Sequence, residues 1–154
     1  NRGPGSFTGT RVASSVIQAI AYTHNIPVIG ISSMWLMAYQ ASRIRSLDQY
    51  CCIKHAYGEM LYISYFSSPL DKNNINVKLI KKSELSIKDD ENIIIEDDSL
   101  VKMVDLQHPN IINLSEHHKS LDAISQIEAL ESNDYKEKNF DLKTTLPDYA
   151  DHEV

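Results

Sequence analysis

Apolar residues at helical spacing mark the first predicted helix, Thr10–His24. Val12 and Val16 step along one face, small residues fill much of the rest, and Asn25 followed by Pro27 ends the helix. A helix with so many small residues can pack closely against neighbours on more than one side. The pattern therefore predicts a helix without saying which core it serves.

A short apolar run and a second helix follow. Pro27–Ser32 has the composition of a buried strand in a parallel sheet. Ser32 or Ser33 then caps a helix that runs from Met34 to about Ser46. A strand followed by a helix favours an α/β layer, so we expect an α/β fold.

The middle of the chain has the pattern of a β-hairpin. Tyr50–Lys54 and Met60–Phe66 are rich in β-branched and aromatic residues, and they flank a turn at Ala56–Glu59. We expect the tyrosines in and near this hairpin to pack in the core: Tyr57, Tyr62 and Tyr65.

The rest of the chain carries weaker signals. Asn76–Lys82 and Asn92–Glu96 are candidate strands, and Leu114–Leu130 has apolar residues at helical spacing. Residues 131–145 are polar and predicted to be irregular.

Charge is unevenly distributed along the 154 residues, which carry a net charge of −6. The first 70 residues hold five basic and two acidic side chains, and the remainder holds ten basic and nineteen acidic ones. This asymmetry indicates two structural units. We assign residues 1–47 to one unit (loop, helix, strand, helix), and residues 48–154 to a second unit with the hairpin, the further strands and a helix near 114–130.

Composition excludes some classes of protein. An acidic chain is not a basic nucleic-acid binder, and no apolar run approaches the ~20 residues of a membrane helix, so we expect no membrane association and a cytoplasmic location. Cys51 and Cys52 are adjacent, and a bridge between neighbours is strained. We interpret them as reduced thiols on a buried strand.

A glycine-rich loop precedes the first helix and is the strongest local signal. It contains Gly3, Gly5, Ser6, Thr8 and Gly9. Backbone N–H groups at a helix start attract anions, so a phosphate loop is one hypothesis. Its G-x-G-x-x-x-G spacing departs from both the P-loop and the dinucleotide fingerprint. A structural turn that lets the helix pack closely is the alternative.

Other candidate chemistry is sparse. His118 and Asp122 would share a face of the predicted last helix, but no third metal ligand stands at firm spacing. The carboxylate runs at residues 89–91 and 96–98 are interpreted as solvated loops. No nucleophile elbow and no H-E-x-x-H motif is present.

The opening segment G-P-G-S-F-T-G-T-R, Gly3–Arg11, resembles the bacterial TsaB (YeaZ) family of tRNA threonylcarbamoyladenosine biosynthesis proteins. The resemblance continues through Ile26–Ser33 and Tyr57–Tyr62 and is weak after residue 66. Leu146–Tyr149 is similar to a family motif near the end, but Ala150 and Asp151 depart from it. Lys54 and Ala56 stand where the family usually has Asp and Arg.

The resemblance implies a two-lobed, actin-like ATPase (ASKHA) fold and a non-catalytic subunit. Such a subunit pairs with a catalytic paralogue, TsaD, and a small ATPase, TsaE, to modify the adenosine beside the anticodon of tRNAs that read codons beginning with A. ATP and metal are expected on the partner subunit, and none on this chain. Ser33 and Met37 stand where the paralogue has two metal-binding histidines, and both are poor ligands for a hard metal.

The resemblance also implies that the helix after the glycine loop forms a helical bundle with TsaD. We expect the partner-facing residues to be Arg11, Ala13, Ser14, Ser15, Gln18, Ala21 and Tyr22. The alternative is that this face packs inside its own lobe. A homodimer in place of the heterodimer is left open.

The family's opening β-rich segment and first bundle helix have no counterpart in this chain. We therefore expect a truncated first lobe whose residues 1–47 are not stable alone. Two other functions are weighed against the scaffold subunit. One is an actin-fold nucleotide hydrolase or protease-like enzyme that uses the Gly3–Gly9 loop, and the other is a degenerate fragment without function.

Overall fold

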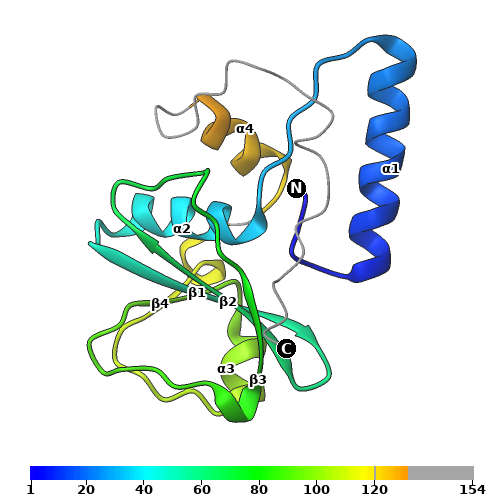
Figure 1. Ribbon diagram of the computed structural model, residues 1–154. Helices are drawn as coiled ribbons and strands as arrows, with labels where there is room; N and C mark the ends of the chain where they lie inside the picture. Colours follow the sequence, from blue (N-terminus) through cyan, green and yellow to red (C-terminus); the bar gives the residue numbers. More distant parts are fainter. Residues whose placement is uncertain (120, 132–154) are drawn as a thin grey trace.

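The computed structural model describes residues 1–119 and 121–131 (Figure 1). Residues 120 and 132–154, including the predicted irregular stretch after Glu131 and the Leu146–Tyr149 motif, lie outside the described residues. In chain order the elements are α1 (Phe7–His24), α2 (Ser33–Ile44), β1 (Gln49–Tyr57), β2 (Met60–Ser67), β3 (Lys78–Lys81), β4 (Ile93–Ile95), α3 (Asp98–Val104), β5 (Ile111–Asn113) and α4 (Ala123–Glu131), with 3₁₀ turns at Lys82–Glu84 and Ser115–His117.

The strands form one mixed five-stranded sheet in the order β3-β2-β1-β4-β5. The hairpin β1–β2 is antiparallel, with Ile53 opposite Ile63, and β3 pairs antiparallel to β2. The strands β1, β4 and β5 run parallel, with Cys52 opposite Ile94 and Ile94 opposite Ile112. The fold is therefore of the mixed α/β type.

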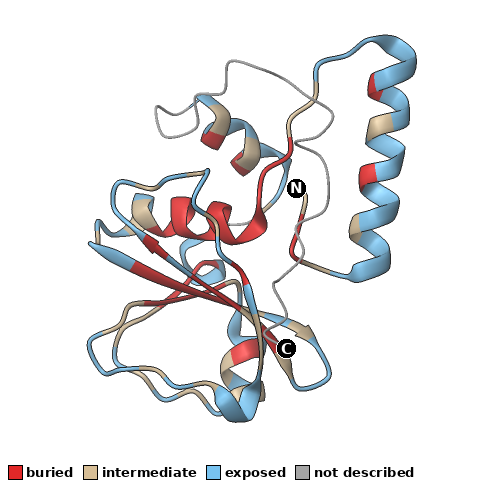
Figure 2. Ribbon diagram, viewed as in Figure 1, coloured by how far each residue is buried: buried red, intermediate tan, exposed pale blue. Residues whose placement is uncertain are grey.

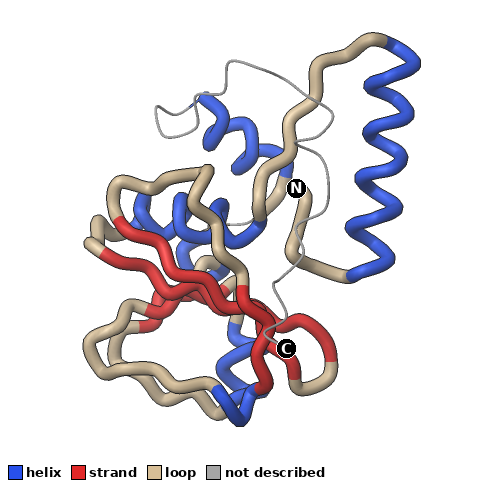
Figure 3. Tube along the Cα trace, viewed as in Figure 1, coloured by secondary structure: helices blue, strands red, loops and turns tan. Residues whose placement is uncertain are grey.

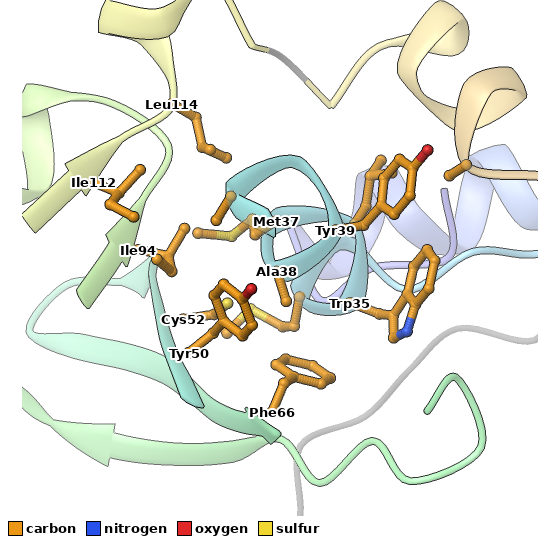
Figure 4. Close-up of a cluster of buried hydrophobic side chains, with 14 of the residues drawn as sticks. Trp35, Met37, Ala38, Tyr39, Tyr50, Cys52, Phe66, Ile94, Ile112 and Leu114 are labelled. Atoms are coloured by element: carbon orange, nitrogen blue, oxygen red, sulfur yellow. The ribbon is translucent and has the colours of Figure 1, made fainter. Parts of the chain in front are cut away.

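Alternation along the strands divides the buried side chains between the two faces of the sheet. Tyr50, Cys52 and Ile94 join a cluster with α2, and this cluster is the larger core (Figure 4). Cys51 and Ile53 face the opposite way and pack with α3. Both cysteines are free and buried, which confirms the interpretation of reduced thiols on a buried strand.

Helix α2 is the centre of the larger core. Every residue from Ser33 to Ala41 is buried, because the sheet covers one side of the helix and α4 packs on another (Figure 2). The Trp35 and Tyr39 rings stack at 5.4 Å between centroids, and the Tyr39 hydroxyl donates to the carbonyl of Glu128 at 3.2 Å. Although residues 1–47 were assigned to a separate unit, α2 packs on the sheet formed by residues 49–113.

Helix α1 stands beside this body, between the N-terminal residues 1–6 and the connection of residues 25–32 that leads to α2 (Figures 1 and 3). Among the described residues, no other helix or strand packs extensively along it. Most of its residues are exposed, Ser14 and Ala21 being the buried ones.

The predicted strand Pro27–Ser32 is wrong, because these residues are extended but form no ladder. The carbonyl of Ile31 instead accepts from the backbone N–H of Arg2 at 2.8 Å. The run is apolar because its end, Gly30–Ser32, is buried against the core, a composition that also fits a packed connection.

The predicted helix Leu114–Leu130 is wrong in its first half. A 3₁₀ turn ends at His118, which is left-handed (φ 53°), and α4 begins only at Ala123. His118 and Asp122 therefore share no helix face, and the described residues contain no group of three or more His, Cys, Asp or Glu able to hold a metal. The sequence analysis also missed α3 and β5.

The hairpin tyrosines only partly follow the expectation. Tyr62 packs against the larger core, but Tyr57 and Tyr65 are more than half exposed, which contradicts the predicted core packing. Tyr57 ends β1 beside the turn, and Tyr65 follows Ser64 on an alternating strand whose outward positions face solvent. The carboxylate run at 96–98 is also more than a solvated loop, because Asp97 caps α3.

Candidate functional site

The glycine-rich loop is tightly closed on itself and on the start of α1. Gly3 has φ +98°, in the left-handed region that favours glycine. A Cβ there would lie 3.3 Å from the backbone nitrogen of Gly5 and from the Thr10 methyl group. A Cβ on Gly5 would meet the Thr10 hydroxyl at 3.4 Å. Glycine is therefore required at residue 3 by both conformation and space.

The loop is also fastened to the start of α2. The backbone N–H of Ser33 donates to the Gly3 carbonyl at 2.6 Å, and the Ser33 hydroxyl donates to the Pro4 carbonyl at 2.8 Å. The backbone N–H of Gly3 donates to the Asn1 side-chain oxygen at 2.9 Å. These contacts assign the loop a structural role, that of joining α1 to α2.

The first turn of α1 is capped within the chain. Ser6 is the N-cap, its hydroxyl accepts from the Gly9 N–H at 3.4 Å, and its carbonyl accepts from the Thr10 N–H at 2.8 Å. The guanidinium of Arg11 lies 3.8 Å from the centre of the Phe7 ring. Thr8 and Gly9 are exposed. One of the N–H groups that a phosphate loop would offer, that of Gly9, is therefore used inside the chain.

Helix α1 has two different faces. Thr10, Ser14, Gln18 and Ala21 lie on one side, which is buried or half-buried. The other side is an apolar stripe, which we define as Val12, Val16, Ile17 and Ile20, each exposed by 45–56%. Hydrophobic side chains on consecutive turns of an exposed helix form a continuous surface that marks an interaction site.

The predicted partner residues are divided between the two faces. Arg11, Ala13, Ser15 and Tyr22 are exposed, and among the described residues Tyr22 is the most exposed large apolar side chain, at 81%. Ser14 and Ala21 are buried and Gln18 is half-buried. The sequence analysis did not include the apolar stripe, because valine and isoleucine at helical spacing are the ordinary signal of a core face.

Two positions bear on metal chemistry. Ser33 is buried and its hydroxyl is already bonded to Pro4, and Met37 is fully buried in the core around α2 (Figure 4). A committed hydroxyl and a buried thioether do not fit a site for a hard metal. The start of α2 therefore lacks the donor set of such a site.

The chain is similar in sequence to proteins named for the biosynthesis of threonylcarbamoyladenosine in tRNA. Residues 1–62 match the family model described as "TsaD: tRNA N6-adenosine threonylcarbamoyltransferase". The chain is 43% identical over 47 residues to the tRNA threonylcarbamoyladenosine biosynthesis protein TsaB of Haemophilus influenzae, which covers 30% of this chain and 20% of that protein. The TsaB of Buchnera aphidicola is 29% identical over 75 residues, 49% of this chain and 33% of that protein.

Solved structures extend the likeness to the whole fold. YeaZ from Pseudomonas aeruginosa matches with a TM-score of 0.63 and 18% identity, over 97% of this chain and 71% of that chain. The chain is therefore similar to TsaB (YeaZ) proteins, in sequence over part of its length and in fold over nearly all of it. It aligns with only a fifth to a third of the length of these two curated TsaB relatives. None of the described helices is both long and apolar enough to cross a membrane.

Proposed function

We propose that this chain is a non-catalytic subunit of the cytoplasmic machinery that makes N6-threonylcarbamoyladenosine beside the anticodon of tRNAs reading codons that begin with A. The observation that carries the proposal is the exposed face of α1, an apolar stripe on a helix with no extensive packing among the described residues. The names of the TsaB relatives and of the matching family model support the pathway.

The proposed partner is a TsaD-type catalytic paralogue. A stripe of valine and isoleucine over two turns fits an apolar helix face of another protein, because burying it removes about 25 cal/mol of unfavourable hydration per Å². Arg11 and Tyr22 are also exposed on α1, and both residue types are enriched where interfaces bind strongly. A TsaE-type ATPase and the tRNA would join through the complex.

The proposed fold of the whole family unit is actin-like with two lobes, and residues 1–47 belong to the first lobe. The similarity in fold to YeaZ supports this, because the match covers 97% of this chain. ATP and metal would be held by the partner. The buried Ser33 and Met37 support this assignment, since neither offers a free metal donor.

The competing function is a nucleotide hydrolase or protease-like enzyme that uses the Gly3–Gly9 loop. Tight binding of ATP by this chain alone would favour it. The bonds from the Gly3 N–H to Asn1 and from the Gly9 N–H to Ser6 argue against it, because these two donors are already used inside the chain.

The test is to mix the chain with the TsaD-type paralogue and measure the mass of the complex by light scattering after size exclusion. A one-to-one complex is expected. Ala13→Arg, which places a charge beside the stripe, should weaken it by about tenfold or more. Ser67→Arg, on an exposed residue at the end of β2, should leave the affinity unchanged.

Three other outcomes are informative. No complex, beside a full-length TsaB control that does bind, would contradict the proposal. Equal weakening by both arginine variants would place the contact away from α1. A doubled mass of the chain alone, lost in Ala13→Arg, would indicate a homodimer instead.

A further inference from the structure

In open α/β sheets, ligands bind beyond the carboxyl ends of the parallel strands. The ligand site lies between two neighbouring strands from which the chain continues in opposite directions. In this sheet that point lies between β1 and β4, because the chain passes from β1 to β2 on one side and from β4 to β5 on the other. A cavity of about 170 Å³ is found there, lined by residues that include Lys54, Glu96, Asp97 and Ser99.

An ion pair occupies this edge. The ammonium of Lys54, at the end of the buried part of β1, contacts the carboxylate of Glu96, which directly follows β4. The side chain of Lys54 is only 21% exposed, and that of Glu96 is 41% exposed. The pair therefore joins the two strands across the position where a ligand would enter.

Further carboxylates surround the pair. Hydrogen bonds from Ser99 lower the pKa of Asp97, and the charge of Lys54 lowers it further. Asp98 accepts from the side-chain amide of Asn113 at 2.6 Å. A phosphate at this cavity would face the negative charges of Glu96 and Asp97, and the ammonium of Lys54 is already committed to Glu96.

We propose that Lys54 is a built-in counter-ion, whose ammonium takes the position in which a bound divalent cation would neutralise Glu96 and Asp97. The cavity consequently holds neither a metal ion nor a metal-bound nucleotide. Carboxylate oxygens are the ligands that Mg²⁺ and Mn²⁺ prefer, so removal of the ammonium leaves a set of groups suited to such a cation.

The test is titration of Mn²⁺ into the full chain and its variants, with free Mn²⁺ measured by electron paramagnetic resonance. Lys54→Met keeps much of the apolar stem and removes the charge. It should bind Mn²⁺ about tenfold or more tightly than the unchanged chain, because a like charge beside the ion is gone. The double variant Lys54→Met, Glu96→Gln should lose this gain, and Lys54→Arg should not show it.

A matched control is available. Lys82 also pairs with a glutamate, Glu59, at 3.8 Å, but on the exposed hairpin. Lys82→Met should leave Mn²⁺ binding unchanged. A folded Lys54→Met chain that binds no better than the unchanged chain overturns the proposal, and so does an unchanged chain that binds as tightly as the variant.

The test also covers a variant that does not fold. If uncompensated carboxylates unfold Lys54→Met, added Mn²⁺ should restore its far-ultraviolet circular dichroism, because an ion that binds only the folded state stabilises it. Failure of Mn²⁺ to restore the fold would contradict the counter-ion role. None of these outcomes depends on TsaD binding, so the proposed function is tested separately.

Discussion

The hydroxyl of Ser33 donates to the carbonyl of Pro4 across 29 positions of the chain, at 2.8 Å, and the bond is buried. Beside it, the backbone N–H of Ser33 donates to the carbonyl of Gly3 at 2.6 Å. One serine thus holds the glycine-rich loop against the first turn of α2 through two bonds, and through the loop it determines where α1 begins.

Replacement of Ser33 should weaken this connection. Ser33→Ala leaves the Pro4 carbonyl without its hydroxyl partner in a buried place, so we expect a loss of about 1–2 kcal/mol in the free energy of unfolding. Urea unfolding followed by circular dichroism measures it. Ser42→Ala is the control, since its hydroxyl bonds to Tyr39 within the same helix and is less buried. An equal loss in both variants would contradict the role of the loop contact.

The two glycines at residues 3 and 9 should respond oppositely to alanine. Gly3→Ala forces an L side chain into φ +98° and against Thr10, and should cost about 1–3 kcal/mol. Gly9→Ala lies within α1, where its Cβ meets Ser6 at an ordinary 3.4 Å, and should be neutral or stabilise by up to about 1 kcal/mol. Thermal unfolding of the two variants distinguishes them. Similar midpoints would mean that the loop is not held in this conformation.

The cysteines should be unreactive in the folded chain. Burial raises the pKa of Cys51 to about 12, although a hydrogen bond with Tyr65 opposes the rise, and burial raises the pKa of Cys52 well above its ordinary value. The thiolate is the reactive form, so labelling with a disulfide reagent at pH 8 should be slow and should speed up in urea. Rapid labelling of both thiols in the absence of urea would contradict the buried positions.

The same thiols make stability fall at alkaline pH. An unfolded cysteine loses its proton near pH 9, whereas folded Cys51 keeps its proton up to about 12. The unfolded state therefore binds fewer protons over this window, and the free energy of unfolding should fall as the pH rises from about 9 to 12. The raised pKa of Tyr65 acts in the same direction. Urea midpoints at pH 8 and 10 measure the fall, and the double Cys→Ser variant should show a smaller one.

The hairpin was predicted, because alternating aromatic and β-branched positions act locally and a Gly-Glu turn joins them, although β1 runs three residues beyond the predicted Lys54, to Tyr57. Pro27–Ser32 was mistaken for a strand because an apolar run describes burial, whereas a strand also needs a neighbour to bond with. The elements α3 and β5 were missed because seven and three residues are too short to establish a period.

In the candidate site, too, some features could be predicted from the sequence and others could not. The glycine loop was found from sequence because Gly3 and Gly5 lie close together in a chain with only five glycines. The apolar stripe of α1 was not, because helical spacing of Val12 and Val16 looks the same whether the side chains face a core or a partner. The Lys54–Glu96 pair joins residues 42 positions apart, a contact that no local pattern contains.

Helix α4 closes the side of α2 that faces away from the sheet, and this has a consequence for the order of synthesis. The residues of α4 leave the ribosome about 80 positions after the end of α2. At about 5–20 residues per second, Tyr39 waits roughly 4–16 s for the helix whose Glu128 carbonyl accepts from its hydroxyl. During that interval the nascent chain lacks the helix that packs on α2, so chaperone crosslinking to stalled chains should be strongest before α4 has left the ribosome and should decline after it.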